Sequence, residues 1–170
     1  IPEYDKIYCV SEPVRKQVIA RFPELADRTE VLLNFIDIKQ VQRRSEEPLS
    51  DPQYTGELKF LTVGRASEEK GYDIAVQITA ELKKRGLCFK WFIIGDGRDL
   101  NKLRTMTKEY QVEQEIIFLG MRENPAPYVK SCDLYLQPSR HEGYPITIVE
   151  ARSLQKDIIA SDIPSMREQI

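Results

Sequence analysis

From residue 57 onward, short apolar runs alternate with stretches of helical character. Five runs of five to eight residues follow one another: ELKFLTV (57–63), CFKWFIIG (88–95), IIFLG (116–120), LYLQPS (134–139) and DIIAS (157–161). Mostly apolar strands separated by helices are typical of a parallel sheet that is covered on both faces. The pattern therefore predicts an α/β fold with a Rossmann-like, doubly wound parallel sheet.

The helical stretches carry apolar residues at spacings of three, four and seven. These residues are Ile74, Ile78 and Leu82 in one stretch and Leu100, Leu103 and Tyr110 in another. Such spacings place side chains on one side of a helix, so we expect both stripes to pack on the sheet. Lys83 and Lys84 are expected to face away from it.

The first third of the chain has a different pattern. Residues 4–10 (YDKIYCV) and 30–34 (EVLLN) read as strands, and Ser11 is a candidate N-cap for the helix between them, with Pro13 in its first turn. Residues 38–56 are polar, contain prolines and show little periodicity, which indicates a linker.

These patterns predict three parts. Residues 1–37 would be the end of a preceding domain, 38–56 a linker, and 57–170 a sheet domain. This last domain would stop within an unfinished strand–helix unit, SDIPSMREQI. We therefore expect the chain to be part of a longer protein.

Composition and charge narrow the function classes. The chain has 170 residues, 41% hydrophobic and 31% charged, which suits one globular domain with a piece of another. With 25 Lys and Arg against 27 Asp and Glu, the net charge gives no case for nucleic acid or an anionic membrane as the main partner. Any anion site must therefore be local.

Cys9, Cys88 and Cys132 lie far apart without a C-x-x-C pair, which argues against a disulfide framework and a zinc site. Such widely spaced, unpaired cysteines are typical of a protein in a reducing compartment. The N-terminus does not resemble a signal peptide, and no apolar run approaches the roughly 18 residues that span a bilayer. We expect a cytoplasmic protein. This location is compatible with a membrane-bound substrate.

The loops that follow the strands are where ligands bind in an open parallel sheet. The first, GRASEEKG, begins at Gly64 and offers two cations, Arg65 and Lys70, just before a helix. Such a loop can bring both cations to one phosphate. It lacks the residues of a Walker loop. The alternative is a solvated loop in which the cations pair with Glu68 and Glu69.

The next loop, GDGRDL, follows a strand and precedes a helix, as a dinucleotide fingerprint would. Leu100 occupies the place of the third glycine, and no clear acidic partner follows. We therefore reject NAD as the first choice and expect Gly95 and Gly97 to form a tight turn.

The segment RHEGYPITIVEAR (140–152) sets two carboxylates around a helix start. Pro145 suits a first helical turn, which leaves the amides of Gly143 and Tyr144 free to meet an anion. Glu142 would lie before the helix and Glu150 about one and a half turns inside it. This layout suits an elongated ligand with hydroxyls at both ends and phosphate between them, such as a sugar nucleotide.

Simpler interpretations exist for each of these side chains. Glu142 could merely complement the helix dipole, and Glu150 could form a surface salt bridge. His141, the only histidine, has no nucleophile motif or second histidine for a metal, which favours a structural or supporting role. Glu142 and Glu150 do not obviously flank a cleft, as the pair of a glycosidase would.

Five segments together resemble the retaining glycosyltransferases of the GT-B fold, family 4, also called glycosyl transferases group 1. The segments are LTVGRASEEKGYDIAV, FIIGDG, IIFLG, LYLQPSRHEGYPITIVEA and DIIASDIPS. They stand in the family's order and cover about residues 57 to 165. The most specific part is the E-x7-E motif, Glu142 to Glu150, combined with Arg65 and Lys70.

The resemblance implies a role for each matching residue. Arg65 and Lys70 would bind the donor diphosphate and stabilise the charge that builds on it as the glycosidic bond breaks. Glu142 would hold hydroxyls of the transferred sugar, and Glu150 would hold those of the ribose. Arg65, Lys70 and Glu142 are thus the implied catalytic residues.

Further donor contacts are implied in the loops: Gly64, Gly120, Met121, Gly143, Tyr144 and Pro145. The main chain near Gly120 and Met121 would meet the nucleobase. No metal and no cofactor are implied, and the donor substrate would be a UDP- or GDP-sugar.

The resemblance also implies that residues 57–170 are the C-terminal, donor-binding domain and that residues 1–37 end the acceptor-binding domain. Phe35 follows Asn34 where the family commonly has glycine. The implied acceptor is a saccharide or a lipid-linked saccharide, bound through a missing N-terminal domain, so we expect this chain alone to be inactive.

The products of such an enzyme would be cell-surface polysaccharides or glycolipids. Its acceptor would be compatible with peripheral membrane association at the inner face of the membrane. The rival interpretations are a non-catalytic nucleotide-binding module and another GT-B enzyme, such as a sugar-nucleotide epimerase or a phosphorylase.

Overall fold

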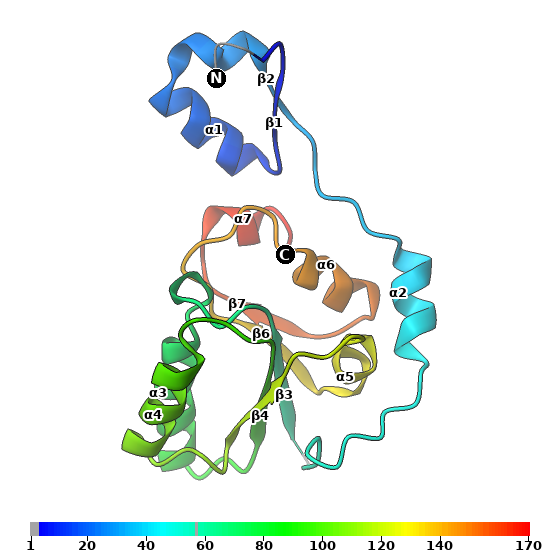
Figure 1. Ribbon diagram of the computed structural model, residues 1–170, viewed down its shortest axis with the longest axis vertical. Helices are drawn as coiled ribbons and strands as arrows, with labels where there is room; N and C mark the ends of the chain where they lie inside the picture. The colour runs from blue at the N-terminus through cyan, green and yellow to red at the C-terminus, as the bar shows by residue number, and fades with distance from the viewer. Residues whose placement is uncertain (1–3, 57) are drawn as a thin grey trace.

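The computed structural model describes residues 4–56 and 58–170, and its main body is a five-stranded parallel sheet (Figure 1). The strand order is β5-β4-β3-β6-β7. The strands are β3 (Lys59–Val63), β4 (Lys90–Ile94), β5 (Ile116–Gly120), β6 (Leu134–Gln137) and β7 (Ile158–Ala160). Each strand lies within one of the five predicted runs, so the prediction of a parallel α/β sheet is confirmed.

Helices cover both faces of this sheet, as a doubly wound fold requires. One face carries α3 (Tyr72–Lys84) and α4 (Leu100–Glu109), and the other carries α5 (Ala126–Ser131) and α6 (Ile146–Ser153) (Figure 1). A short α7 (Pro164–Arg167) follows β7.

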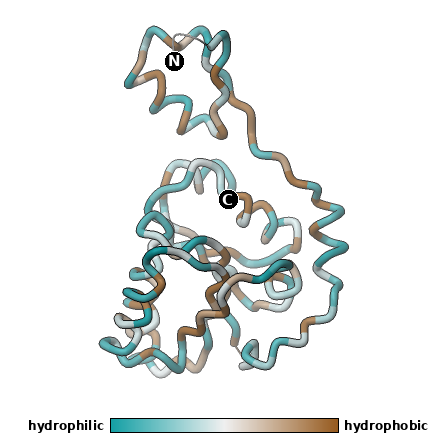
Figure 2. The backbone as a smooth tube through the Cα atoms, in the orientation of Figure 1, coloured by the Kyte–Doolittle hydropathy of each residue, from teal (hydrophilic) through white to brown (hydrophobic). Residues whose placement is uncertain are grey.

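The central strands send alternate side chains into two separate cores. Phe60, Trp91 and Ile93 pack with α3 and α4. Leu61 and Phe92 pack on the opposite face with α5 and α6. Burial on both faces explains why these strands read as continuous apolar runs, which Figure 2 shows as hydrophobic colouring at the centre of the sheet.

The expected helix stripes are partly wrong. Ile78 is 40% exposed, and Tyr110, which lies beyond the end of α4, is 43% exposed. The face of α3 that packs on the sheet instead includes small residues such as Ala75, Thr79 and Ala80. Small side chains let a helix approach the sheet closely. The spacing of the large apolar residues alone therefore predicted the wrong buried face for this helix. Lys83 and Lys84 are exposed, as expected.

Near the N-terminus, β1 (Ile7–Cys9) and β2 (Thr29–Val31) form a separate two-stranded parallel sheet. Between them lie α1 (Glu12–Arg21) and a 3-10 segment, η1 (Pro23–Arg28). The Ser11 side chain accepts from the Val14 amide at 3.4 Å, which confirms the predicted N-cap. Figure 1 shows this unit above the main sheet, with α1 nearest to α7.

Within the predicted linker, the first part is a helix that the sequence pattern did not predict, α2 (Ile38–Ser45). Asp37 caps it by accepting from the Gln40 amide at 3.0 Å. Contacts with α5 and α6 hold α2 in place. It is short and mostly polar, and its apolar side consists of Ile38 and Val41 alone, so its pattern was overlooked in the sequence. The division of the chain at residues 37 and 56 stays a prediction.

Over residues 4–56 and 58–170, no helix combines the length and the apolar character that crossing a bilayer demands.

Candidate functional site

The site lies where the strand order reverses. β4 and β5 extend from one side of β3, whereas β6 and β7 extend from the other. The loops that leave the carboxyl ends of β3 and β6 therefore diverge around a crevice, which is where open α/β sheets bind ligands. These two loops contain Arg65, Lys70 and Glu142.

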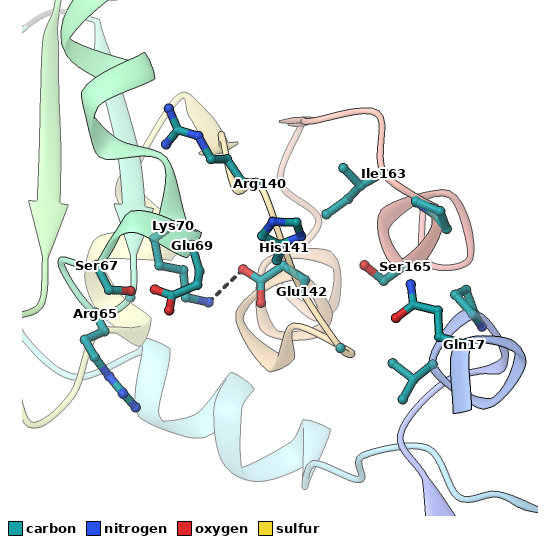
Figure 3. Close-up of a pocket in the computed structure, with 15 residues that line it drawn as sticks. Gln17, Arg65, Ser67, Glu69, Lys70, Arg140, His141, Glu142, Ile163 and Ser165 are labelled. Carbon is teal, nitrogen blue, oxygen red and sulfur yellow. Dashed lines mark hydrogen bonds and ion pairs between the residues drawn. The ribbon is translucent and has the colours of Figure 1, made fainter. Parts of the chain in front are cut away.

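A pocket of about 830 Å³ occupies this crevice (Figure 3). Gly64, Arg65, Lys70, Glu142 and Gly143 line it from the two sheet loops. The facing wall is made by α1, through Pro13, Val14 and Gln17, and by residues 163–165 at the start of α7. The pocket therefore lies between the sheet domain and the N-terminal unit.

Two glycines allow the loops to pack at this point. Gly71 has φ +66°, and a Cβ there would lie 2.1 Å from the Pro138 carbonyl oxygen. Gly95 has φ +137°, and its Cβ would lie 1.9 Å from the Gly64 carbonyl oxygen. Only glycine fits at either position. The GDGRDL segment thus contributes close packing against the Gly64 loop, in keeping with the predicted turn.

Lys70 and Glu142 form an ion pair at the centre of the site, with Nζ 2.7 Å from Oε1. The same Oε1 accepts from Ser139 Oγ at 2.7 Å and from Gln137 Nε2 at 3.0 Å. The Glu142 side chain is only 8% exposed. Lys70 therefore pairs with a carboxylate from the other loop, and the alternative pairing with Glu68 or Glu69 is wrong for this residue.

Arg65 is exposed and lines the pocket without an ion pair to any residue that the structure describes. Its neighbour Glu69 has a lowered pKa, chiefly because Ser67 donates a hydrogen bond to it, with smaller contributions from Arg98 and Arg65. The Glu69 carbonyl accepts from the Arg140 amide at 2.8 Å, which ties the two loops together.

The Gly-Tyr-Pro turn leads into α6, whose N-cap is Pro145, one position before the helical turn in which we expected it. Across the described residues, the amides of Gly143 and Tyr144 have no acceptor within the protein. Asn34 Nδ2 donates to the Tyr144 carbonyl at 3.1 Å and links the N-terminal unit to this turn. Gly143 lines the pocket, but Tyr144 and Pro145 do not.

Glu150 lies in α6 and outside the pocket lining. Burial raises the pKa of its carboxyl group, an effect that the charge of Arg44 on α2 partly opposes. The surface salt bridge considered for Glu150 is absent among residues 4–56 and 58–170. Sequence reasoning missed Arg44, because it did not predict the helix α2 that carries this residue.

Gly120 and Met121 likewise lie outside the pocket lining. Gly120 ends β5 with φ +71°, and no atom lies within 4 Å of the position of a Cβ. Met121 is 72% exposed. This edge of the site is open, whereas the Lys70–Glu142 centre is closed.

The structure adds residues that the sequence reasoning did not select. Gln137 and Ser139 contact Glu142. Gln17 and Ser165 line the far side of the pocket (Figure 3). The polar pair flanking Pro138 was the available signal for Gln137 and Ser139. His141 also lines the pocket. In the described segments, no group of three or more His, Cys, Asp or Glu side chains is arranged to hold a metal.

Residues 44–170 match the model of a protein family described as "Glycosyl transferases group 1". This match covers most of the chain and includes every loop that builds the site.

Among curated proteins, the chain is similar to "Uncharacterized glycosyltransferase MJ1059" of Methanocaldococcus jannaschii. The two are 30% identical over 165 residues, which is 94% of this chain and 40% of that protein. A Campylobacter jejuni relative is 25% identical over 162 residues, 95% of this chain and 42% of its own length. Its name is N-acetylgalactosamine-N,N'-diacetylbacillosaminyl-diphospho-undecaprenol 4-alpha-N-acetylgalactosaminyltransferase. The chain spans about two fifths of these relatives.

Among solved structures, the chain resembles Anabaena Alr3699/HepE in complex with UDP-glucose, with a TM-score of 0.81 and 19% identity. The match covers 98% of this chain and 47% of that one. This likeness supports the Rossmann-like fold described above.

Proposed function

The chain belongs to the glycosyl transferases group 1 family, and from this premise we propose that it is the donor-binding part of a retaining glycosyltransferase of the GT-B fold, family 4. The donor would be a nucleoside diphosphate sugar carrying UDP or GDP. The observation that supports this most strongly is the meeting of Lys70, Arg65 and Glu142 at one pocket beyond the carboxyl ends of β3 and β6.

Lys70 and Arg65 provide positive charge for the diphosphate. The Lys70 ammonium has three donors, of which the ion pair with Glu142 uses one, so two remain for phosphate oxygens. The Arg65 side chain lies at the pocket and forms no ion pair with a carboxylate among the described residues. The free amides of Gly143 and Tyr144 at the start of α6 would add donors to the same anion.

Glu142 would bind the transferred sugar and Glu150 the ribose, with the main chain of Gly120 and Met121 next to the base. Glu150 is half-buried with no donor from the described chain, so ribose hydroxyls would supply the hydrogen bonds that its carboxylate lacks.

In the reaction, the bond between the sugar's anomeric carbon and the diphosphate oxygen breaks, and its electron pair stays with the diphosphate. The acceptor hydroxyl forms the new bond to the anomeric carbon, and its proton passes to the departing diphosphate oxygen. Lys70 and Arg65 stabilise the negative charge that develops on the leaving diphosphate. We propose no metal and no cofactor for this step.

The acceptor is proposed to be a saccharide or a lipid-linked saccharide, and the products cell-surface polysaccharides or glycolipids. The Campylobacter relative supports this, because its name includes a diphospho-undecaprenol-linked acceptor. A full-length enzyme with such an acceptor would work in the cytoplasm at the inner face of the membrane.

The test is calorimetric binding of UDP, GDP, ADP and NAD to this chain and to the variant Arg65→Ala/Lys70→Ala. We expect one nucleoside diphosphate to bind and the variant to lose that binding, while binding of the matching nucleoside changes little. Lys84→Ala/Lys108→Ala is the matched control, because it removes the same charge from exposed positions outside the pocket. Equal binding by the parent and the pocket variant would refute the proposed site.

A further inference from the structure

Glu142 stands at the end of a continuous series of buried and partly buried hydrogen bonds that starts from the sheet. The Val63 amide donates to the Tyr135 hydroxyl oxygen at 3.3 Å, and this hydroxyl donates to Gln137 Oε1 at 3.3 Å. Gln137 Nε2 then donates to Ser139 Oγ at 2.9 Å and to Glu142 Oε1 at 3.0 Å. The Ser139 hydroxyl completes the chain by donating to the same Oε1 at 2.7 Å.

The hydrogen bonds of this series have only one consistent direction from donor to acceptor. Gln137 donates its two side-chain N–H groups to Ser139 and Glu142, and its carbonyl oxygen accepts from Tyr135. Burial raises the pKa of Tyr135, so that its hydroxyl keeps the proton it donates. Since a carboxylate can only accept, turning the Gln137 amide round would place its carbonyl oxygen against Glu142 Oε1 and lose that hydrogen bond.

Gln137, Ser139 and Tyr135 have no exposed surface. Polar side chains at such positions cost stability unless they are fully hydrogen-bonded, and apolar residues of similar shape would fill the same space. This polar chain does not cross the core from one surface to another. It leads from a backbone amide of β3 to one oxygen of one carboxylate, which indicates that orienting this carboxylate is its role.

All three protein donors to Glu142, from Lys70, Gln137 and Ser139, meet at Oε1. Oε2 receives no hydrogen bond from the residues that the structure describes. Figure 3 shows the Glu142 carboxylate facing Lys70 within the pocket.

We propose that Gln137 and Ser139 are positioning residues for the donor sugar: they fix Oε1 of Glu142, so that Oε2 is presented to a sugar hydroxyl. This inference rests on the proposed function. It also explains how Lys70 can contact phosphate without displacing Glu142, because two uncharged, buried donors hold the carboxylate independently of the lysine. Neither residue touches the ligand in this arrangement, so both act through Glu142.

The test compares the affinity for a nucleoside diphosphate with that for its sugar. Calorimetry on this chain would give the dissociation constants of UDP, UDP-glucose, GDP and GDP-mannose. The sugar increment is the dissociation constant of the nucleoside diphosphate divided by that of its sugar nucleotide. We expect Ser139→Ala to lower this ratio about tenfold, the effect of losing one hydrogen bond to a charged group, while the diphosphate alone binds within about twofold of the parent.

A double-mutant cycle separates positioning from a general structural effect. In a Glu142→Ala background, Ser139→Ala should leave the sugar increment unchanged, because it acts only through that carboxylate. Thr107→Val is the matched control for losing a buried hydroxyl elsewhere, since the Thr107 hydroxyl donates to the Arg104 carbonyl on α4. If Ser139→Ala does not fold, as judged by its thermal transition, Gln137→Met is measured in the same way.

The outcomes distinguish the two proposals. Failure of the parent to bind any nucleotide would overturn the proposed function and this inference together. If the parent binds nucleotides but has no sugar increment, or if Ser139→Ala leaves the increment unchanged, only the inference is overturned. An equal loss of diphosphate and sugar-nucleotide affinity would also overturn it, because that is the signature of a merely structural role.

Discussion

Glu142 and Glu150, the two carboxylates of one motif, lie in opposite surroundings. Glu142 has one oxygen held by Lys70, Gln137 and Ser139 and is almost fully covered by the chain. Glu150 has neither a hydrogen bond nor an ion pair to its carboxylate within the described residues, and burial raises its pKa. The first is fixed by the protein before any ligand arrives, whereas the second lacks donors that a ligand could supply.

The same contrast holds for the surrounding loops. The closed half of the site, residues 64–71 and 138–143, consists of two loops packed against each other. The open half is the end of β5 at Gly120 and Met121. A site of this kind would hold the reacting sugar and diphosphate rigidly while leaving the nucleoside end adaptable.

The largest effect should come from a methyl group in the closed half. Gly71→Ala would force a left-handed backbone on alanine and place its Cβ 2.1 Å from the Pro138 carbonyl. We expect the free energy of unfolding to fall by about 3 kcal/mol or more, measured by urea denaturation followed through Trp91 fluorescence.

Gly120→Ala is the matched change in the open half. Its φ of +71° is similar, but the space around it is empty, so only the backbone strain of about 1 kcal/mol is expected. Equal losses for the two variants would show that the loops after β3 and β6 are not packed as described.

A smaller effect is expected from Lys70→Met, which keeps the apolar stem and removes the charge. Glu142 would then remain a mostly buried carboxylate with only uncharged donors, and the free energy of unfolding should fall by about 1–2 kcal/mol. Lys83→Met is the control, because its pair with Glu115 lies at an exposed lysine and should contribute less than 1 kcal/mol. A larger loss for the control would mean that Glu142 does not depend on Lys70.

Much of the main fold was predictable from the sequence, because strands buried on both faces have no polar alternation to obscure them. Trp91, Phe92 and Ile93 are consecutive apolar residues that enter two different cores. The helix α2 could not be predicted in this way. It is only eight residues long and mostly polar, with an Asp37 cap as its local signal. Its contacts with α5 and α6 lie outside any local window of sequence.

The site was predictable only in part. Arg65, Lys70 and Glu142 stand in loops that topology must bring together, but the Lys70–Glu142 pair joins residues 72 positions apart. The contact of Gln137 with Glu142 could not be predicted for a different reason. A glutamine at the end of an apolar strand does not indicate which neighbour it will contact. Three-dimensional packing decides that contact.

Glu150→Gln should change stability less than Lys70→Met and in the opposite direction. A carboxyl group whose folded-state pKa is raised opposes folding when ionised, so the parent loses stability as pH rises from the unfolded pKa through the raised one. Glutamine removes that cost. The variant should have the higher Tm at pH 7, and the difference should vanish as pH falls below the ordinary glutamate pKa.

The same substitution should weaken donor binding if Glu150 holds the ribose, so gained stability and lost affinity are expected together. Thermal unfolding across pH and calorimetry with UDP and GDP would measure both. A variant that is less stable at pH 7 would contradict the interpretation that the Glu150 carboxylate lacks partners.

The smallest change in stability is expected for Arg65→Ala, although this residue faces the same pocket as Lys70. Arg65 is exposed and forms no ion pair in the described structure, so urea denaturation should show a difference within about 0.5 kcal/mol. Its proposed partner is the diphosphate alone, and UDP or GDP affinity should still fall about tenfold. If Arg65→Ala instead destabilised the chain as much as Lys70→Met, the two cations would share a structural role, and the division between a centre fixed by the protein and a rim completed by the ligand would be wrong.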